Sequence, residues 1–134
     1  MQLKALDHVA LRVRDLEKTL HFYRQLGLTV LRKRGPDSAG RRFAVLQVGN
    51  QELNISCRPD YASPGQDDTV GIDHFCFEVD AASIDEVVAS LQHAGIEIAD
   101  GPMERRDSTA LMLIDPDGVN VELQLKRPQP GSLR

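Results

Sequence analysis

Two stretches of this 134-residue chain are nearly the same: LDHVALRV at residues 6–13 and IDHFCFEV at residues 72–79. In each stretch a histidine stands at the start of an alternating apolar and polar pattern, which is typical of a β-strand with one buried face. Repetition on this scale indicates a duplicated unit. Because the repeated unit includes the histidine, it also predicts a metal site where the two halves of the protein meet.

The repeat continues after the two strands. Residues 15–27 and 83–95 each have apolar residues at helical spacing, an N-capping residue at the start, Asp15 or Ser83, and a glycine at the end. Three further strands are predicted after each helix, separated by turn residues. They cover residues 28–33, 43–48 and 52–57 in the first half and residues 97–100, 110–114 and 119–125 in the second. The sequence therefore predicts an α+β fold of two tandem βαβββ modules.

The length of the chain favours one domain over residues 1–128, followed by a flexible tail at residues 129–134. Module 1 covers about residues 3–58 and module 2 about residues 70–126. A module of this size is too small to cover its own sheet, so we expect two curved mixed sheets, with their helices outside, to enclose a cup.

Composition excludes several classes of partner. The net charge is −4 with dispersed Lys and Arg, and only 4% of residues are aromatic, so there is no basic stripe and no stacking platform for nucleic acid. No apolar run is long enough to span a membrane, and no signal peptide is visible. We expect a cytoplasmic protein in which Cys57 and Cys76 are ordinary reduced thiols.

The alternation along the strands assigns their polar faces. His8, Ala10 and Arg12 share one face of the first strand, and His74, Cys76 and Glu78 share the corresponding face of the fifth. Aligning the last hairpins of the two halves makes Asn54 the repeat equivalent of Glu122. The four equivalent positions are His8, Asn54, His74 and Glu122.

Two imidazoles and a carboxylate that converge on one sheet face are the ligand set of a catalytic divalent metal. His8, His74 and Glu122 would leave coordination positions open, and they suit Fe, Mn, Ni or Zn. Asn54 is either a weak fourth ligand or, as we favour, a hydrogen-bonding neighbour. Arg12 and Glu78 either contact the substrate or form a salt bridge with each other. The charged turn at residues 105–108 is either solvated or closes over a ligand, and we favour solvation.

Three segments are distinctive: the paired LDH and IDH strands, DLEKTLHFYRQLGL at residues 15–28 and IDPDGVNVEL at residues 114–123. Together they resemble the vicinal oxygen chelate superfamily, which includes glyoxalase I, fosfomycin-resistance proteins, extradiol dioxygenases and metal-free bleomycin-resistance proteins. The resemblance covers residues 3 to about 126. It places His8, His74 and Glu122 on the metal-ligand positions of the family. It implies a substrate that chelates the metal through two oxygens.

The resemblance also ranks the reactions. Glyoxalase I-like enzymes usually carry Glu or Gln where this chain has Asn54, and the acid/base His and Tyr of extradiol dioxygenases would fall near Met103 and Met112. Fosfomycin-type thiol transferases have a Thr at the position of Ala10. A lyase, isomerase or thiol-transferase-like reaction is therefore favoured over ring cleavage, and the resemblance further implies a homodimer. The alternative is a metal-free binding protein of the bleomycin-resistance type.

Overall fold

The computed structural model describes residues 1–2, 4–58, 60 and 72–128. The chain divides into two compact units, residues 1–64 and residues 65–134, which are described one at a time. The proposed tail at residues 129–134 lies outside the described residues. Neither helix of the described part is both long and apolar enough to cross a membrane.

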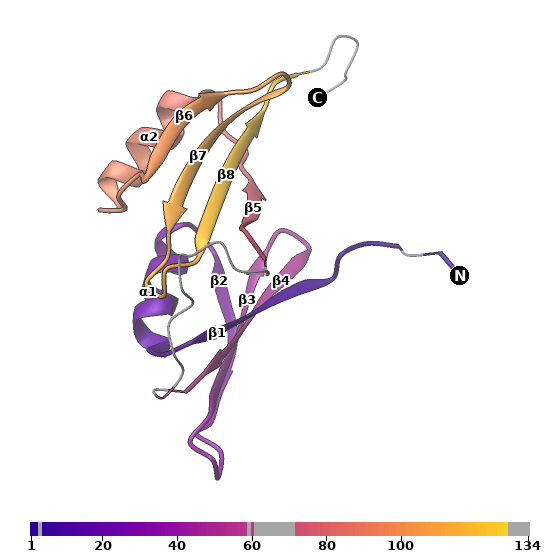
Figure 1. The fold of residues 1–134 in the computed structure, drawn as a ribbon, viewed down its shortest axis with the longest axis vertical. Helices are drawn as coiled ribbons and strands as arrows, with labels where there is room; N and C mark the ends of the chain where they lie inside the picture. Colours follow the sequence, from indigo (N-terminus) through magenta and orange to yellow (C-terminus); the bar gives the residue numbers. More distant parts are fainter. Residues whose placement is uncertain (3, 59, 61–71, 129–134) are drawn as a thin grey trace. The chain divides into compact units, whose positions relative to one another are not determined.

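The first unit is a four-stranded sheet with one helix along one face (Figure 1). Its elements are β1 (His8–Val13), α1 (Leu16–Gln25), β2 (Thr29–Arg34), β3 (Arg42–Val48) and β4 (Gln51–Cys57). The strand order is β1-β4-β3-β2, in which β1 is parallel to β4 and the other pairs are antiparallel. The order β1-α1-β2-β3-β4 is the predicted βαβββ module.

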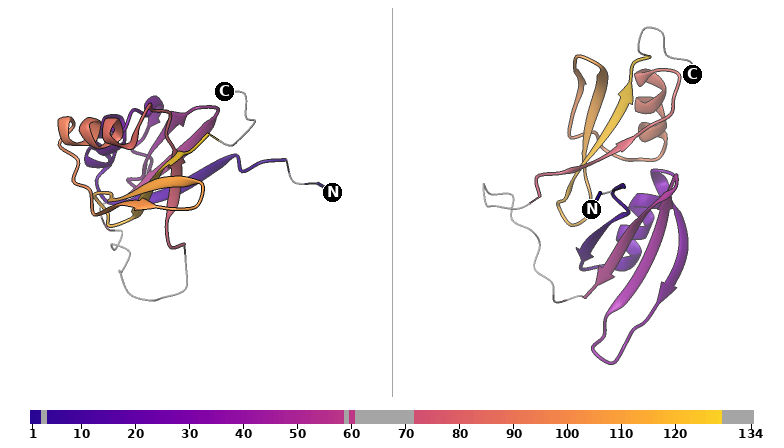
Figure 2. Two further views of the ribbon diagram at one scale, coloured as in Figure 1. Left: turned by 90° about the horizontal axis from the view of Figure 1, so that it is seen from above. Right: turned by 90° about the vertical axis from the view of Figure 1, so that its right-hand side faces the viewer.

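The second unit repeats this topology (Figure 2). Its elements are β5 (Phe75–Glu78), α2 (Ile84–His93), β6 (Asp100–Glu104), β7 (Ser108–Ile114) and β8 (Asn120–Lys126). The strand order is β5-β8-β7-β6, again with one parallel pair, β5 with β8. The predicted fold of two tandem βαβββ modules is therefore confirmed.

Both helices begin at the predicted caps. The Asp15 carboxylate accepts a hydrogen bond from the backbone N–H of Lys18, and the Ser83 hydroxyl accepts one from Glu86. Each cap satisfies a backbone donor that the helix itself leaves unpaired. The buried positions of α1 and the alternate residues of β3 and β4 form the core of the first unit. They include Leu16, Leu20, Tyr23, Ala44, Leu46, Leu53 and Ile55.

Two strand predictions need correction. The strand predicted at residues 97–100 lies instead at Asp100–Glu104 and contains Gly101 and Pro102, which interrupt its pairing with β7. Proline is tolerated here because β6 is an edge strand, which pairs with β7 on one side only. The backbone N–H that proline lacks is therefore not needed for pairing with a second strand. The strand predicted from residue 72 begins only at Phe75, so His74 immediately precedes β5 rather than lying within it.

The register of the strands confirms the predicted faces. Ala10 pairs with Asn54 in the first unit, and Cys76 pairs with Glu122 in the second, so Asn54 and Glu122 occupy equivalent positions. Residues adjacent to them along the strands point to the helix-covered face and are buried, as Leu53 and Val121 show. The other face of each sheet carries the candidate functional side chains.

Candidate functional site

The second unit brings His74 and Glu122 into contact. Nε2 of His74 lies 2.9 Å from Oε2 of Glu122. The Glu122 residue is only 2% exposed, whereas the His74 side chain is 36% exposed. A buried carboxylate is costly unless it is paired, so this contact indicates a built polar site on the face of the sheet that α2 does not cover.

A tight turn positions the strand that carries Glu122. Oδ1 of Asp115 accepts hydrogen bonds from the backbone N–H groups of Asp117 and Val119, each at 2.9 Å, and Gly118 donates to the Asp115 carbonyl. Gly118 has φ +86°, a conformation that favours glycine. The turn therefore sets the start of β8, which begins at Asn120, two residues before Glu122.

The second oxygen of Glu122 faces an arginine. Oε1 of Glu122 lies 3.1 Å from Nη1 of Arg105, an ion-pair distance, yet no group among the described residues donates a hydrogen bond of good geometry to this oxygen. The sequence prediction favoured a solvated turn at residues 105–108. The structure instead directs Arg105 toward the candidate site, where its charge offsets that of the carboxylate.

Each candidate histidine is held by the aspartate that precedes it. Nδ1 of His74 lies 2.7 Å from Oδ2 of Asp73, and Nδ1 of His8 lies 2.8 Å from Oδ1 of Asp7. A hydrogen bond at Nδ1 orients an imidazole and leaves Nε2 available as a ligand. Sequence reasoning missed the two aspartates, although the doubled Asp-His pair was a visible signal.

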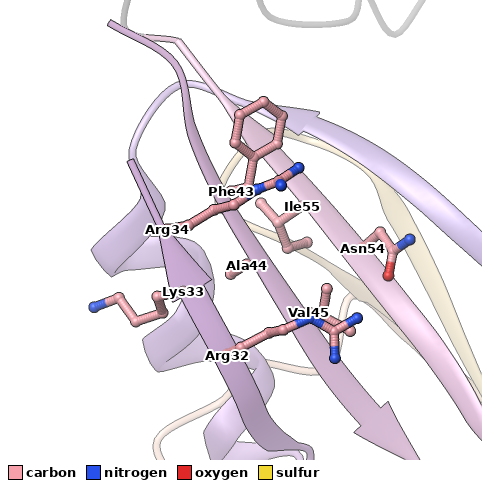
Figure 3. Close-up of a pocket in the computed structure, with 8 residues that line it drawn as sticks. All are labelled: Arg32, Lys33, Arg34, Phe43, Ala44, Val45, Asn54 and Ile55. Carbon is pink, nitrogen blue, oxygen red and sulfur yellow. The ribbon is translucent and has the colours of Figure 1, made fainter. Parts of the chain in front are cut away.

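Asn54 occupies the Glu122-equivalent position in the first unit. Its Oδ1 atom is buried and has no hydrogen-bond partner among the described residues. Asn54 lines a pocket with side chains of β2 and β3 (Figure 3). An unpaired buried acceptor is uncommon in native proteins, so Asn54 is a candidate contact for a bound molecule.

The remaining predicted site residues have simpler surroundings. Oε1 of Glu78 lies 3.4 Å from Nζ of Lys126, within the second unit. Arg12 is exposed on β1 and pairs in register with Ser56. Cys76 lies beside Glu122 on β5, and burial, with the nearby Glu122 carboxylate as a second cause, raises the pKa of its thiol to about 11. No disulfide joins Cys57, which is buried, to Cys76, which is exposed.

Within the described residues, no three His, Cys, Asp or Glu side chains are grouped closely enough to hold a metal ion. The second unit by itself supplies two of the three predicted ligands, His74 and Glu122. His8 belongs to the first unit, where the described Nδ1 contact to Asp7 leaves its Nε2 available.

The family model for the Glyoxalase/Bleomycin resistance protein/Dioxygenase superfamily matches residues 5–123. The chain belongs to this superfamily. Among solved structures, a glyoxalase family protein from Enterococcus faecalis is similar with 31% identity and a TM-score of 0.78, over 92% of this chain and 99% of that one. The resemblance inferred from the sequence is thus confirmed, as is the fold.

Curated relatives within the superfamily include proteins named as enzymes. A probable lactoylglutathione lyase from Synechocystis sp. is 28% identical over 87% of this chain and 91% of its own length. The metallothiol transferase FosB from Staphylococcus epidermidis is 26% identical over 92% of this chain and 82% of its own length. These two relatives are thus named for two different reaction classes, a lyase and a transferase.

Proposed function

We propose that this chain is a divalent-metal-dependent enzyme that acts on a small oxygenated substrate. The observation that carries the proposal is the 2.9 Å contact between Nε2 of His74 and Oε2 of the buried Glu122. An imidazole nitrogen and a carboxylate oxygen lie next to each other at this contact, and both are atom types that bind transition metals. His8 is the third proposed ligand, because it repeats His74 and has the same hydrogen bond to a preceding aspartate.

The donor set fits a catalytic rather than a structural ion. Two imidazoles and one carboxylate favour Fe, Mn, Ni or Zn, and three protein ligands leave room for substrate oxygens. Oε1 of Glu122, which faces Arg105 at 3.1 Å, is a second carboxylate oxygen that receives no hydrogen bond of good geometry from a described group. A divalent cation held by these residues would polarise substrate oxygens and stabilise negative charge that develops on them.

Asn54, Arg12 and Glu78 are the proposed residues around the substrate. The Oδ1 atom of Asn54 accepts a hydrogen bond from a substrate hydroxyl or an ordered water, and the neutral amide orients that group without taking its proton. Arg12 supplies an exposed positive charge on the same face of the first sheet. Glu78 remains ion-paired with Lys126 until a substrate group displaces the lysine.

The reaction class that we favour is a lyase, isomerase or thiol transfer. A lactoylglutathione lyase and a metallothiol transferase among the relatives support this choice. Ring cleavage is disfavoured because Met103 and Met112 occupy the positions expected for its acid/base residues, and a thioether neither donates nor accepts a proton at neutral pH.

Metal content decides the main proposal. We expect protein purified without chelator, or reconstituted with Fe, Mn, Ni or Zn, to hold about one equivalent of metal, measured by inductively coupled plasma mass spectrometry. His74→Ala and Glu122→Ala should lose the metal while keeping their circular dichroism spectra. His93→Ala is the matched control, because His93 is an exposed histidine of the same unit on α2.

Two results would contradict the proposal. One is a folded protein that takes up none of the four metals. The other is a loss of metal in His93→Ala as large as that in His74→Ala. The first result would leave the metal-free binding protein of the bleomycin-resistance type as the better description, since the pocket around Asn54 does not depend on the proposed ligands.

We also propose that the protein is a homodimer in the cytoplasm, with each metal site completed either within one subunit or by His8 of the partner. Light scattering after size-exclusion chromatography tests the dimer. Mixing His8→Ala with Glu122→Ala subunits tests the sharing. If the sites are shared, the mixed dimer regains half of its metal content, because one of its two sites then has all its ligands. If each site lies within one subunit, the mixed dimer regains no metal, because each site lacks one ligand.

A further inference from the structure

A pocket of about 320 Å³ lies on the face of the first sheet that α1 does not cover (Figure 3). Strands β2, β3 and β4 line it, and none of the lining side chains is acidic. The lining residues are Arg32, Lys33, Arg34, Phe43, Ala44, Val45, Asn54 and Ile55. A cavity of this size accommodates a small organic ligand.

Two arginines extend across this pocket from the edge strand. Arg32 and Arg34 are alternate residues of β2, so they share one face, and they pair in register with Val45 and Phe43 of β3. Figure 3 shows both side chains extending across β3 in the direction of Asn54, whereas Lys33 points the other way. The Lys33 ammonium donates a hydrogen bond to Glu17 of α1 at 2.8 Å, so its charge is compensated on the helix side.

The charges of Arg32 and Arg34 are not compensated within the described residues. No acidic side chain in the described part of the chain forms an ion pair with either of them, although the net charge of the protein is −4. By contrast, Arg41, which also lies near the Phe43 ring, is paired with Asp37. Two unpaired guanidinium groups at one pocket in an acidic protein indicate an anion-binding surface.

The pocket also holds one of these groups in place before a ligand arrives. The Arg34 guanidinium carbon lies 4.7 Å from the centre of the Phe43 ring, a cation–π contact that restricts the arginine to this face. Opposite the arginines, the buried Oδ1 of Asn54 receives no hydrogen bond from any described residue. The pocket thus offers positive charge, an apolar wall at Phe43 and Val45, and one free acceptor.

We propose that this pocket binds the oxyanion group of an organic anion, either a carboxylate or a phosphonate-type group. A hydroxyl group of the bound ligand, or a water molecule bound with it, then donates a hydrogen bond to Oδ1 of Asn54. Arg32 and Arg34 bind the anion, and Phe43 and Val45 contact its apolar part. The anion binding itself does not depend on the proposed function. Only the statement that the anion is part of the substrate rests on it. Asn54, which belongs both to the pocket and to the proposed catalytic residues, connects the two.

The test uses metal-free protein, prepared with a chelator and then dialysed, so that no metal contributes to binding. Benzoate and phenylphosphonate are the two anionic probes, and benzamide is the neutral analogue of benzoate. We expect benzoate to bind about 10-fold more tightly than benzamide, as charge-assisted hydrogen bonds predict. The relative affinities of benzoate and phenylphosphonate report which anion the arginines fit better.

Three variants on β2 locate the binding. Arg32→Gln and Arg34→Gln should each weaken benzoate binding about 5- to 10-fold. Lys33→Gln removes the same charge from the same strand but on the opposite face, so it should change the affinity less than about 2-fold. In ¹H–¹⁵N NMR spectra of the unmodified protein, benzoate should shift the arginine side-chain signals and the amides of residues 43–45.

Equal binding of benzamide and benzoate would overturn the inference, as would an effect of Lys33→Gln equal to that of Arg32→Gln. The comparison of benzamide with benzoate uses the unmodified protein, so an unstable variant does not prevent the test. Metal content measured on the same preparation before chelation reports separately on the proposed metalloenzyme. A protein that binds metal but not benzoate rejects only the anion pocket, and the reverse result rejects only the metal site.

Discussion

Nε2 of His74 and Oε2 of Glu122 lie 2.9 Å apart, although 48 positions separate the two residues in the sequence. The parallel pairing of β5 with β8 produces this contact, because it aligns Cys76 with Glu122 and thereby sets His74, two residues earlier, diagonally across from the carboxylate.

The aspartate beside each histidine should tune metal affinity. Asp73 accepts a hydrogen bond at 2.7 Å from Nδ1 of His74. This hydrogen bond orients the ring and makes Nε2 a stronger ligand for a metal ion. We expect Asp73→Asn to weaken binding of Zn or Ni about 10-fold, as is usual for such partners. Competition with a coloured chelator measures the affinity. Asp80→Asn, an exposed change in the same unit, is the control, and an equal loss in both variants would contradict the role of Asp73.

Arg105 should oppose the metal while stabilising the metal-free protein. Its guanidinium lies 3.1 Å from Oε1 of Glu122, so it offsets the charge that a cation would otherwise meet. Without metal, Arg105→Gln should lower the melting temperature and the free energy of unfolding, because the buried Glu122 carboxylate loses its ion pair. The loss should be only about 1–2 kcal/mol, because the arginine is half exposed and solvent screens the pair. Added Zn or Ni should then raise the melting temperature of the variant more than that of the unmodified protein.

A neighbouring arginine provides the comparison for Arg105→Gln. Arg106→Gln removes the same charge one position away, and no contact links Arg106 to Glu122 among the described residues. If both variants respond to metal alike, general electrostatics rather than the Arg105–Glu122 pair accounts for the effect.

The turn before β8 should be needed for both stability and metal binding. The buried Asp115 carboxylate accepts backbone hydrogen bonds from Asp117 and Val119, and these bonds set the start of the strand that carries Glu122. Asp115→Ala leaves both donors without this acceptor and should cost about 2–3 kcal/mol in urea unfolding. Asp115→Asn keeps one acceptor oxygen and should lose less unfolding free energy than Asp115→Ala. A larger loss in Asp115→Asn than in Asp115→Ala would contradict this account.

The turn before β3 predicts a pH response. The backbone N–H of Arg41 and, to a smaller degree, that of Ala39 donate to the Asp37 carboxylate and hold its pKa below the ordinary value of 3.8. Since the folded pKa is lowered, the contribution of this turn to stability is fully present above pH about 4 and is lost as the pH falls through the folded pKa. Carboxyl ¹³C shifts measure the titration.

The cause of this pKa shift can be separated from side-chain charge. Arg41→Gln retains the backbone donor, which has the largest effect, and removes the guanidinium. The Asp37 pKa of this variant should therefore rise only slightly and remain below the ordinary value. A return to the ordinary value would show that the arginine charge, rather than the backbone hydrogen bond, lowers the pKa.

Much of the fold was predictable because its signals are local. The caps at Asp15 and Ser83 and the alternation from His8 to Val13 act within a few residues, and duplication presented each signal twice. The misplaced sixth strand was not predictable in this way. Gly101 and Pro102 are turn residues by their local preference, and only their place at the edge of the sheet makes them compatible with a strand.

The sequence by itself determined the two βαβββ modules, the faces of their strands, and the equivalence of Asn54 with Glu122, because alternation and repetition are properties of the linear order. The tertiary structure alone decided that Arg105 faces Glu122 and that Arg32 and Arg34 share a pocket with Asn54. These contacts join residues from different strands and loops. Pairing register and side-chain packing select such partners, and neither is written in the spacing of residues along the chain.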